Sequence, residues 1–253
     1  MAVSKTRALK ALLSLYGFKQ KNGIFYRLYQ DESVQAIKLC RERTLQTFTY
    51  VAVYSIYERN LPEYLARSLV LPLSYSVPSF VGKRFTDRVY LTEEQARELS
   101  QGTGFSLDNG RPFVYYEPTP EEELAYLRET VLPRLGRICS QEDILAFYDE
   151  LDLVEHYKQL LVNPVRICPA LASENYELAS AVLSAIFAQN SSAIESYREY
   201  YKNEPEVFQQ RCEEVLEGQK PLRRIEQLLA DKNEEEIHSF LETAKKQNLE
   251  FLK

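Results

Sequence analysis

The 253-residue sequence predicts an α+β protein, with an antiparallel sheet packed with helices in its N-terminal part and a mostly helical C-terminal part. Three observations predict this. Strand-like runs rich in Thr, Val, Tyr and Phe follow one another before residue 60, and the short turns between them permit antiparallel neighbours without a crossover. Helix caps and a 3.6-residue apolar period dominate after Pro118. Apolar residues make up 45% and charged residues 27%, which is typical of a globular protein and argues against disorder.

The N-terminal elements can be read in order. Residues 5–16 place Leu9, Leu12, Leu13 and Tyr16 on one face of an amphipathic helix, and Gly17 is well placed to end it. Strands are expected at 24–29, 34–40 and 45–57. The last of these carries bulky residues on both faces, which predicts a central strand covered on both sides.

The middle of the sequence mixes signals. A helix is expected to begin near residue 61, and further strands are expected within 83–91 and 111–117. Thr92 and Gln95 have the spacing of a helix capping box between those two strands.

The C-terminal part shows repeated helix starts. Capping boxes begin at Thr119, Ser140 and Ser192, and the sequence offers Ser173 and Asn233 as further N-terminal caps. Residues 176–188 are apolar nearly all round, so this helix is predicted to be the most buried. We therefore expect an α+β domain at 1–117 and a helical domain at 118–253.

One resemblance concerns the N-terminal part. The order of a helix, the segment 15–21 (LYGFKQK), the segment 25–27 (FYR) and the segment 34–39 (VQAIKL) resembles a bacterial domain-of-unknown-function family. The match covers the first 60 to 115 residues and departs from the family at 38–41 and in the long helical tail. The resemblance implies the fold and a loose association with toxin–immunity neighbourhoods, and it implies no catalytic residues.

The sequence lacks the motifs of common catalytic, metal and cofactor sites. His156 and His238 have no metal-ligand spacing around them, and neither a Gly-x-Ser-x-Gly elbow nor a phosphate-binding glycine loop is present. The cysteines at 40, 139, 168 and 212 are far apart, as expected of free thiols in a reducing compartment. We expect no cofactor, no metal and a cytoplasmic location, without a membrane-spanning segment.

Charge is unevenly distributed. Residues 1–60 hold ten Lys/Arg and four Asp/Glu, whereas the remainder holds 21 and 33, for a net charge of −6. Basic and aromatic residues interleave near the N-terminus, yet no ribonucleoprotein motif is present and the isoelectric point is about 5.3. The missing motif and the low isoelectric point argue against a nucleic-acid partner.

An acidic stretch suggests the function. Six acidic residues lie within 142–155 with no Lys or Arg among them, and they are the predicted partner-binding residues: Glu142, Asp143, Asp149, Glu150, Asp152 and Glu155. We expect a non-catalytic binding protein, immunity-like or an adaptor, that engages a basic macromolecular partner through this face. The alternative is an enzyme whose site is assembled at the sheet–helix junction from Tyr, Arg and carboxylate groups. The sequence leaves the oligomeric state open.

Overall fold

The computed structural model describes residues 5–41, 47–67, 88–100, 106–115, 119–152 and 164–253. The chain divides into two compact units. The first comprises Met1–Tyr29, Val34–Val53 and Glu63–Ile138, and the second comprises Gln30–Ser33, Tyr54–Pro62 and Cys139–Lys253. The fold is α+β, as the sequence predicts.

The first unit contains a four-stranded antiparallel sheet in the order β1-β2-β3-β4, with strands Lys19–Lys21, Ile24–Tyr29, Ser33–Arg41 and Thr47–Ser55. The short strand β1 was not expected. It pairs with β2 so that Gln20 lies opposite Phe25, across a turn in which Asn22 and Gly23 both have positive φ. An Asn-Gly pair is the preferred two-residue hairpin turn, so the signal for β1 was present in the sequence.

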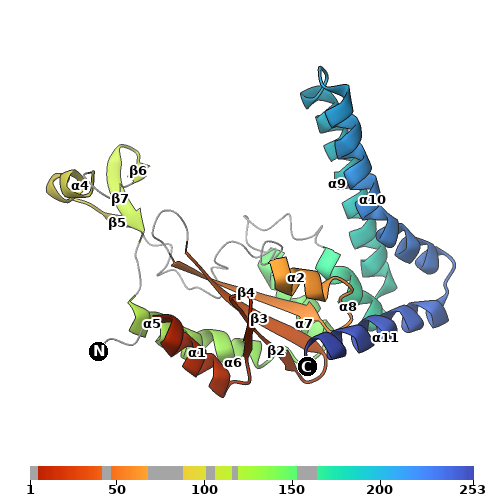
Figure 1. Ribbon diagram of the computed structural model, residues 1–253, viewed down its shortest axis with the longest axis horizontal. Helices are drawn as coiled ribbons and strands as arrows, with labels where there is room; N and C mark the ends of the chain where they lie inside the picture. Colours follow the sequence, from red (N-terminus) through yellow and green to blue (C-terminus); the bar gives the residue numbers. More distant parts are fainter. Residues whose placement is uncertain (1–4, 42–46, 68–87, 101–105, 116–118, 153–163) are drawn as a thin grey trace. The chain divides into compact units, whose positions relative to one another are not determined.

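Helices cover this sheet. Helix α1 (Lys5–Leu15) ends where predicted, because Gly17 has a φ of 80° and the Phe18 amide bonds the Leu13 carbonyl at 3.1 Å, as in a Schellman motif. Helix α1 contacts α5 (Pro120–Tyr126), which continues through the π-helical segment η2 (Leu127–Val131) into α6 (Leu132–Leu135). Figure 1 shows α1, α5 and α6 on one side of the sheet.

The central strands are buried on both faces. In β3 the adjacent residues Ala36 and Ile37, whose side chains point to opposite faces, are both fully buried. In β4 the consecutive residues 51–53 are buried as well. The two-sided burial predicted for 45–57 therefore holds for the part of that run whose side chains are described.

A second, smaller antiparallel sheet has the order β5-β7-β6, with strands Arg88–Tyr90, Arg111–Tyr115 and Ser106–Asp108. Helix α4 (Glu93–Ser100) begins at the predicted capping box, in which the Thr92 and Gln95 side chains each accept a hydrogen bond from the other residue's amide. Helix α2 spans Leu61–Arg67. The rest of the helix-like run from 68 to 75, and parts of the two expected strands at 83–87 and 116–117, lie outside the described residues.

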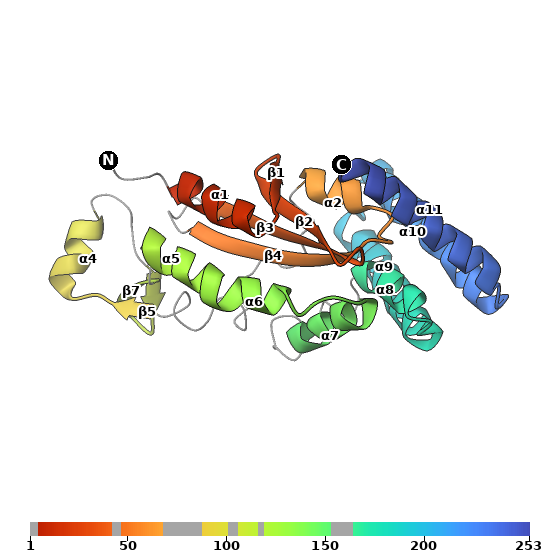
Figure 2. The same ribbon diagram turned by 90° about the horizontal axis from the view of Figure 1, so that it is seen from below.

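The second unit is mainly helical. It contains α7 (Gln141–Asp152), η4 (Pro164–Arg166), α8 (Ile167–Ala172), α9 (Tyr176–Tyr200), α10 (Pro205–Ala230) and α11 (Glu234–Phe251). Figure 2 shows α8, α9, α10 and α11 gathered together. Their core consists of side chains from α8, the first half of α9, the second half of α10 and the first half of α11. Within the described residues, no helix is both long and apolar enough to cross a membrane.

Three C-terminal expectations are wrong. Ser192 lies inside α9 and starts no helix, and the N-cap of α9 is Asn175, not Ser173, which follows α8. The most buried helix is α8, in which all of 167–171 are buried, whereas α9 is buried on one face only. Ser180, Ala181 and Ser184 are exposed, and small residues of this kind made the helix look apolar all round.

Candidate functional site

The structure separates the six predicted binding residues by role. Asp143 accepts hydrogen bonds from the amides of Cys139 and Ser140 at 2.8 and 3.0 Å, so it caps the start of α7. Asp149 pairs with Arg166, whose side chain is only 2% exposed. These two carboxylates therefore have structural roles, which α7 needs whether or not a partner exists.

The structure says less about the other four residues. Glu142 and Glu150 are exposed on α7, Asp152 is the last residue of that helix, and Glu155 lies outside the described residues. The acidic face of α7 is thus narrower than the sequence suggests, and its binding role remains a prediction.

A second surface comes from the hairpin of α9 and α10. The two helices lie side by side in antiparallel orientation and are joined by residues 201–204. Their inner halves contribute to the core, but residues 188–218 contain no buried side chain. We call residues 188–218 the arm. Figure 1 shows it as the far end of the α9–α10 pair, reaching beyond α8 and α11.

The arm is held by a seam between its two helices. Half-buried residues recur at spacings of three and four along each helix, as in a coiled coil. They are Asn190, Ala193, Ile194, Tyr197 and Tyr201 on one side, and Val207, Phe208, Cys212 and Val215 on the other. Ion pairs between neighbouring turns, such as Arg211 with Glu214 at 2.8 Å, lie on the outer surface of α10. The seam was not predicted, although its mostly apolar side chains at spacings of three and four are a signal for it in the sequence.

The surface of the arm is acidic and carries exposed apolar groups. Tyr200 is 79% exposed and Leu216 is 53% exposed. The arm contains three basic residues and seven glutamates. The basic residues are Arg198, Lys202 and Arg211, and the glutamates are Glu195, Glu199, Glu204, Glu206, Glu213, Glu214 and Glu217. The arm therefore has a net charge of −4.

The second unit also holds a buried carboxyl–thiol pair. Glu58 is 4% exposed and lies beside the thiol of Cys168 from α8; its Oε1 accepts a hydrogen bond from the Asn60 amide at 3.2 Å, and its buried Oε2 has no hydrogen-bond partner among the described residues. Burial raises the pKa of Glu58 to about 7, and burial beside Glu58 raises the pKa of Cys168 well above its usual range. The Asn248 side chain of α11 binds the backbone around Glu58, because it donates hydrogen bonds to the carbonyls of Ile56 and Glu58 at 2.7 and 2.8 Å.

A partly exposed polar cluster lies on neighbouring segments of the same unit. Lys245 Nζ lies 3.7 Å from Glu32 Oε1 and 3.4 Å from the Tyr57 hydroxyl. The Gln141 amide donates to Glu32 Oε2 at 2.6 Å and to the Glu32 carbonyl at 3.0 Å. These contacts join α7, α11 and two turns, and they leave one buried acceptor, Gln141 Oε1, without a hydrogen-bond partner in the part of the chain that the structure describes.

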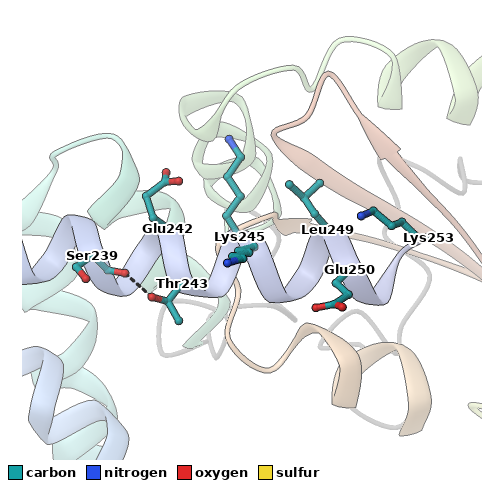
Figure 3. A pocket seen from close by; sticks show the side chains of 8 residues that line it. Ser239, Glu242, Thr243, Lys245, Leu249, Glu250 and Lys253 are labelled. Carbon is teal, nitrogen blue, oxygen red and sulfur yellow. Dashed lines mark hydrogen bonds between the residues drawn. The ribbon is translucent and has the colours of Figure 1, made fainter.

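Two hollows in the described part of this unit are open. One lies along α11 and is lined by side chains of that helix and of the C-terminal residue: Ser239, Glu242, Thr243, Lys245, Lys246, Leu249, Glu250 and Lys253. Figure 3 shows these side chains pointing to both sides of α11, so they enclose no cleft. The other, of about 590 Å³, is a groove between α10 and α11 with Arg59 at its wall. Neither hollow includes Glu58 or Cys168.

No group of three or more His, Cys, Asp or Glu residues that could hold a metal ion occurs in the described part of the chain. His238 is exposed on α11, and His156 lies outside the described residues. Of the predicted free thiols, those of Cys139, Cys168 and Cys212 are free, and the side chain of Cys40 is not described.

Comparison of the chain with models of protein families, with curated proteins and with solved structures finds no match. The resemblance of the N-terminal part to a bacterial family therefore stays a prediction.

Proposed function

We propose that this protein is a non-catalytic binding protein that engages a basic protein partner through acidic surface, and that the arm supplies this surface. The observation that carries the proposal is the run of residues 188–218 without a buried side chain. Fixing the backbone of a residue costs about 1–2 kcal/mol, and a half-buried seam offsets this less well than a packed core does. A partner that covers the arm would add the missing burial.

The size of the arm fits this role. Each of its helices contributes about 14 residues, or roughly 20 Å of length, and each helix is about 10 Å wide. One broad face of the pair therefore offers on the order of 400 Å². A standard protein interface buries about 800 Å² on each partner, so the partner would have to contact both faces or the tip as well.

The charge of the arm selects the partner. A net charge of −4 attracts a basic protein and repels nucleic acid, whose phosphates are negative. The acidic residues of α7 that remain exposed, Glu142 and Glu150, form a second candidate surface for the same partner.

The alternative is an enzyme at the sheet–helix junction, and its supporting observation is the perturbed Glu58–Cys168 pair. Both residues are buried, and burial disfavours the thiolate that would act as nucleophile. Native protein should therefore leave Cys168 unmodified by iodoacetamide at pH 8, while Cys168 reacts after unfolding. Rapid modification of native protein would favour the enzyme.

The test of the binding function uses three matched double variants. One reverses charge on the arm (Glu195→Lys with Glu199→Lys), one on α7 (Glu142→Lys with Glu150→Lys), and one on α11 (Glu242→Lys with Glu250→Lys). A partner is first captured from host lysate and purified, and its affinity is then measured at low and high salt. All three variants change the net charge equally, so only the location of the charge differs.

We expect the arm variant to weaken the complex by about tenfold and to reduce its salt dependence, while the α11 variant stays near the unaltered protein. If only the α7 variant loses affinity for the partner, the binding site lies on α7 and not on the arm. Equal losses of affinity in all three variants would show that only the net charge of the protein matters. If no variant loses affinity, the proposal is wrong.

A further inference from the structure

We infer that the ring of Tyr200, at the tip of the arm, receives an arginine or lysine side chain of the partner. This inference rests on the proposed function and specifies its central contact. Tyr200 is the last residue of α9, and its side chain is 79% exposed. Exposure alone would not make it a binding residue, so the argument depends on how the ring is held and on what surrounds it.

Three tyrosine rings pack together at the tip. Tyr200 meets Tyr201 edge-to-face with a centroid distance of 4.8 Å, and Tyr201 is tilted against Tyr197 at 6.1 Å. The Tyr201 hydroxyl is hydrogen-bonded by Arg211 of α10, and Arg211 in turn pairs with Glu214 at 2.8 Å. The rings beneath Tyr200 are thus fixed from both helices.

This support leaves Tyr200 braced on one side and uncovered on the other. A ring that is already held loses little conformational freedom when a partner contacts it, so more of the interaction energy appears as affinity. Tyr side chains are enriched among the residues that dominate interfaces for this reason.

The chemistry of the ring points to a cation. Several other aromatic rings in this protein already face one of its own cations. Arg27 lies 4.5 Å from the Tyr29 centroid, Arg111 lies 4.7 Å from that of Tyr90, and Arg223 lies 3.6 Å from that of Phe187. Among the described residues, Tyr200 has no such cation.

The charge of the arm as a whole favours the same partner. Close to Tyr200 in the sequence, Arg198 and Lys202 are matched by Glu199 and Glu204. Over residues 188–218 the net charge is −4, which attracts a cationic side chain. Base stacking on the tyrosines would require a positive groove to hold the nucleic-acid backbone, whereas the arm has seven glutamates against three basic residues.

The experiment uses a fluorescent nonapeptide of alternating arginine and glycine, with citrulline replacing arginine in a neutral counterpart. Binding to the full chain is followed by anisotropy. Tyr200→Leu removes the ring and keeps an apolar side chain, Tyr200→Phe keeps the ring, and Leu216→Ser changes another exposed apolar residue elsewhere on the arm.

We expect the arginine peptide to bind and the citrulline peptide to bind much more weakly. Tyr200→Leu should weaken binding by about two- to fivefold, as expected for an exposed cation–π contact, while Tyr200→Phe and Leu216→Ser leave it unchanged. The same order should hold with the purified partner.

The possible failures are distinguishable. If Tyr200→Leu binds like the unaltered protein while the Glu195→Lys, Glu199→Lys variant is weakened, this inference is wrong and the proposed function stands. If neither variant is weakened, or the arginine peptide does not bind, both are wrong. If the protein binds an RNA oligonucleotide and Tyr200→Leu abolishes that binding, the group that contacts the Tyr200 ring is a nucleobase and not a cationic side chain.

Discussion

Glu58 shows how one buried residue makes the stability of this protein depend on pH. Its carboxyl is sealed in the second unit beside the Cys168 thiol, and the groups identified around it supply hydrogen bonds but no positive charge to stabilise the carboxylate. The pKa is about 7 in the folded protein, against a usual value of 4.5. The folded state therefore holds this proton more tightly than the unfolded state does.

The sign of the pH dependence follows. Between about pH 4.5 and 7 the unfolded state loses the proton first, so the free energy of unfolding falls as pH rises, by about 3 kcal/mol for this group. Glu58→Gln should make the free energy of unfolding less dependent on pH. Above pH 7 this variant should be more stable than the unaltered protein. Denaturant titrations from pH 4.5 to 8.5 measure this. Glu250→Gln, an exposed change on α11, is the control, and parallel curves for all three proteins would contradict the role of Glu58.

Gln35 shows a limit of reading residues from a strand pattern. It lies in β3 and is fully buried, although a polar side chain in a strand is usually expected to face solvent. Its side chain accepts from Arg27 Nε at 2.9 Å and donates to the Leu135 carbonyl at 2.7 Å. The partners are 8 and 100 residues away, so no local pattern could reveal them.

Replacing Gln35 should therefore be costly. Gln35→Met keeps the size of the side chain but leaves the Leu135 carbonyl and the Arg27 Nε group without this partner, for an expected loss of about 1–3 kcal/mol of unfolding free energy. Chemical denaturation gives the value. Gln20→Met on the exposed strand β1 should change stability by far less, and equal effects would show that the buried hydrogen bonds contribute nothing.

At the scale of elements, local signals predicted most and long-range packing predicted least. The capping boxes at Thr92 and Thr119 form as expected because all their atoms lie within four residues. The same spacing at Ser192 is overridden, since residues around it continue the seam between α9 and α10. Hence the helices were predictable, but the arm was not.

The inner half of α9 still carries the core that its sequence predicts. Leu183 is 1% exposed and packs with residues of α8, α10 and α11. Leu183→Ala should lower the free energy of unfolding by about 2–5 kcal/mol, because it leaves a cavity in a packed core. Ser184→Ala, one residue on and exposed, should have little effect in the same denaturation assay. A loss below about 1 kcal/mol for Leu183→Ala would show that the site repacks easily.

At the scale of the whole molecule, the two compact units do not follow the chain in order. The sequence predicts domains at 1–117 and 118–253, because strand-like runs give way to helical ones after Pro118. The mainly helical compact unit contains 30–33 and 54–62 in addition to 139–253. The segment 54–62 contributes Glu58 to the pair with Cys168 and the two carbonyls that Asn248 binds.

A chain cut at the predicted boundary tests which description governs folding. The fragment 118–253 lacks Ile56, Tyr57 and Glu58, so the Asn248 amide and the faces of α8 and α11 that meet this segment would be exposed. We expect the fragment to keep helix by circular dichroism but to unfold at lower denaturant and less cooperatively than the full chain. Adding residues 1–117 as a separate chain should restore the transition, since that chain supplies 54–62. Full stability of the fragment alone would instead make 118–253 an autonomous domain, and the contacts of Asn248 and Cys168 would then contribute little to its folding.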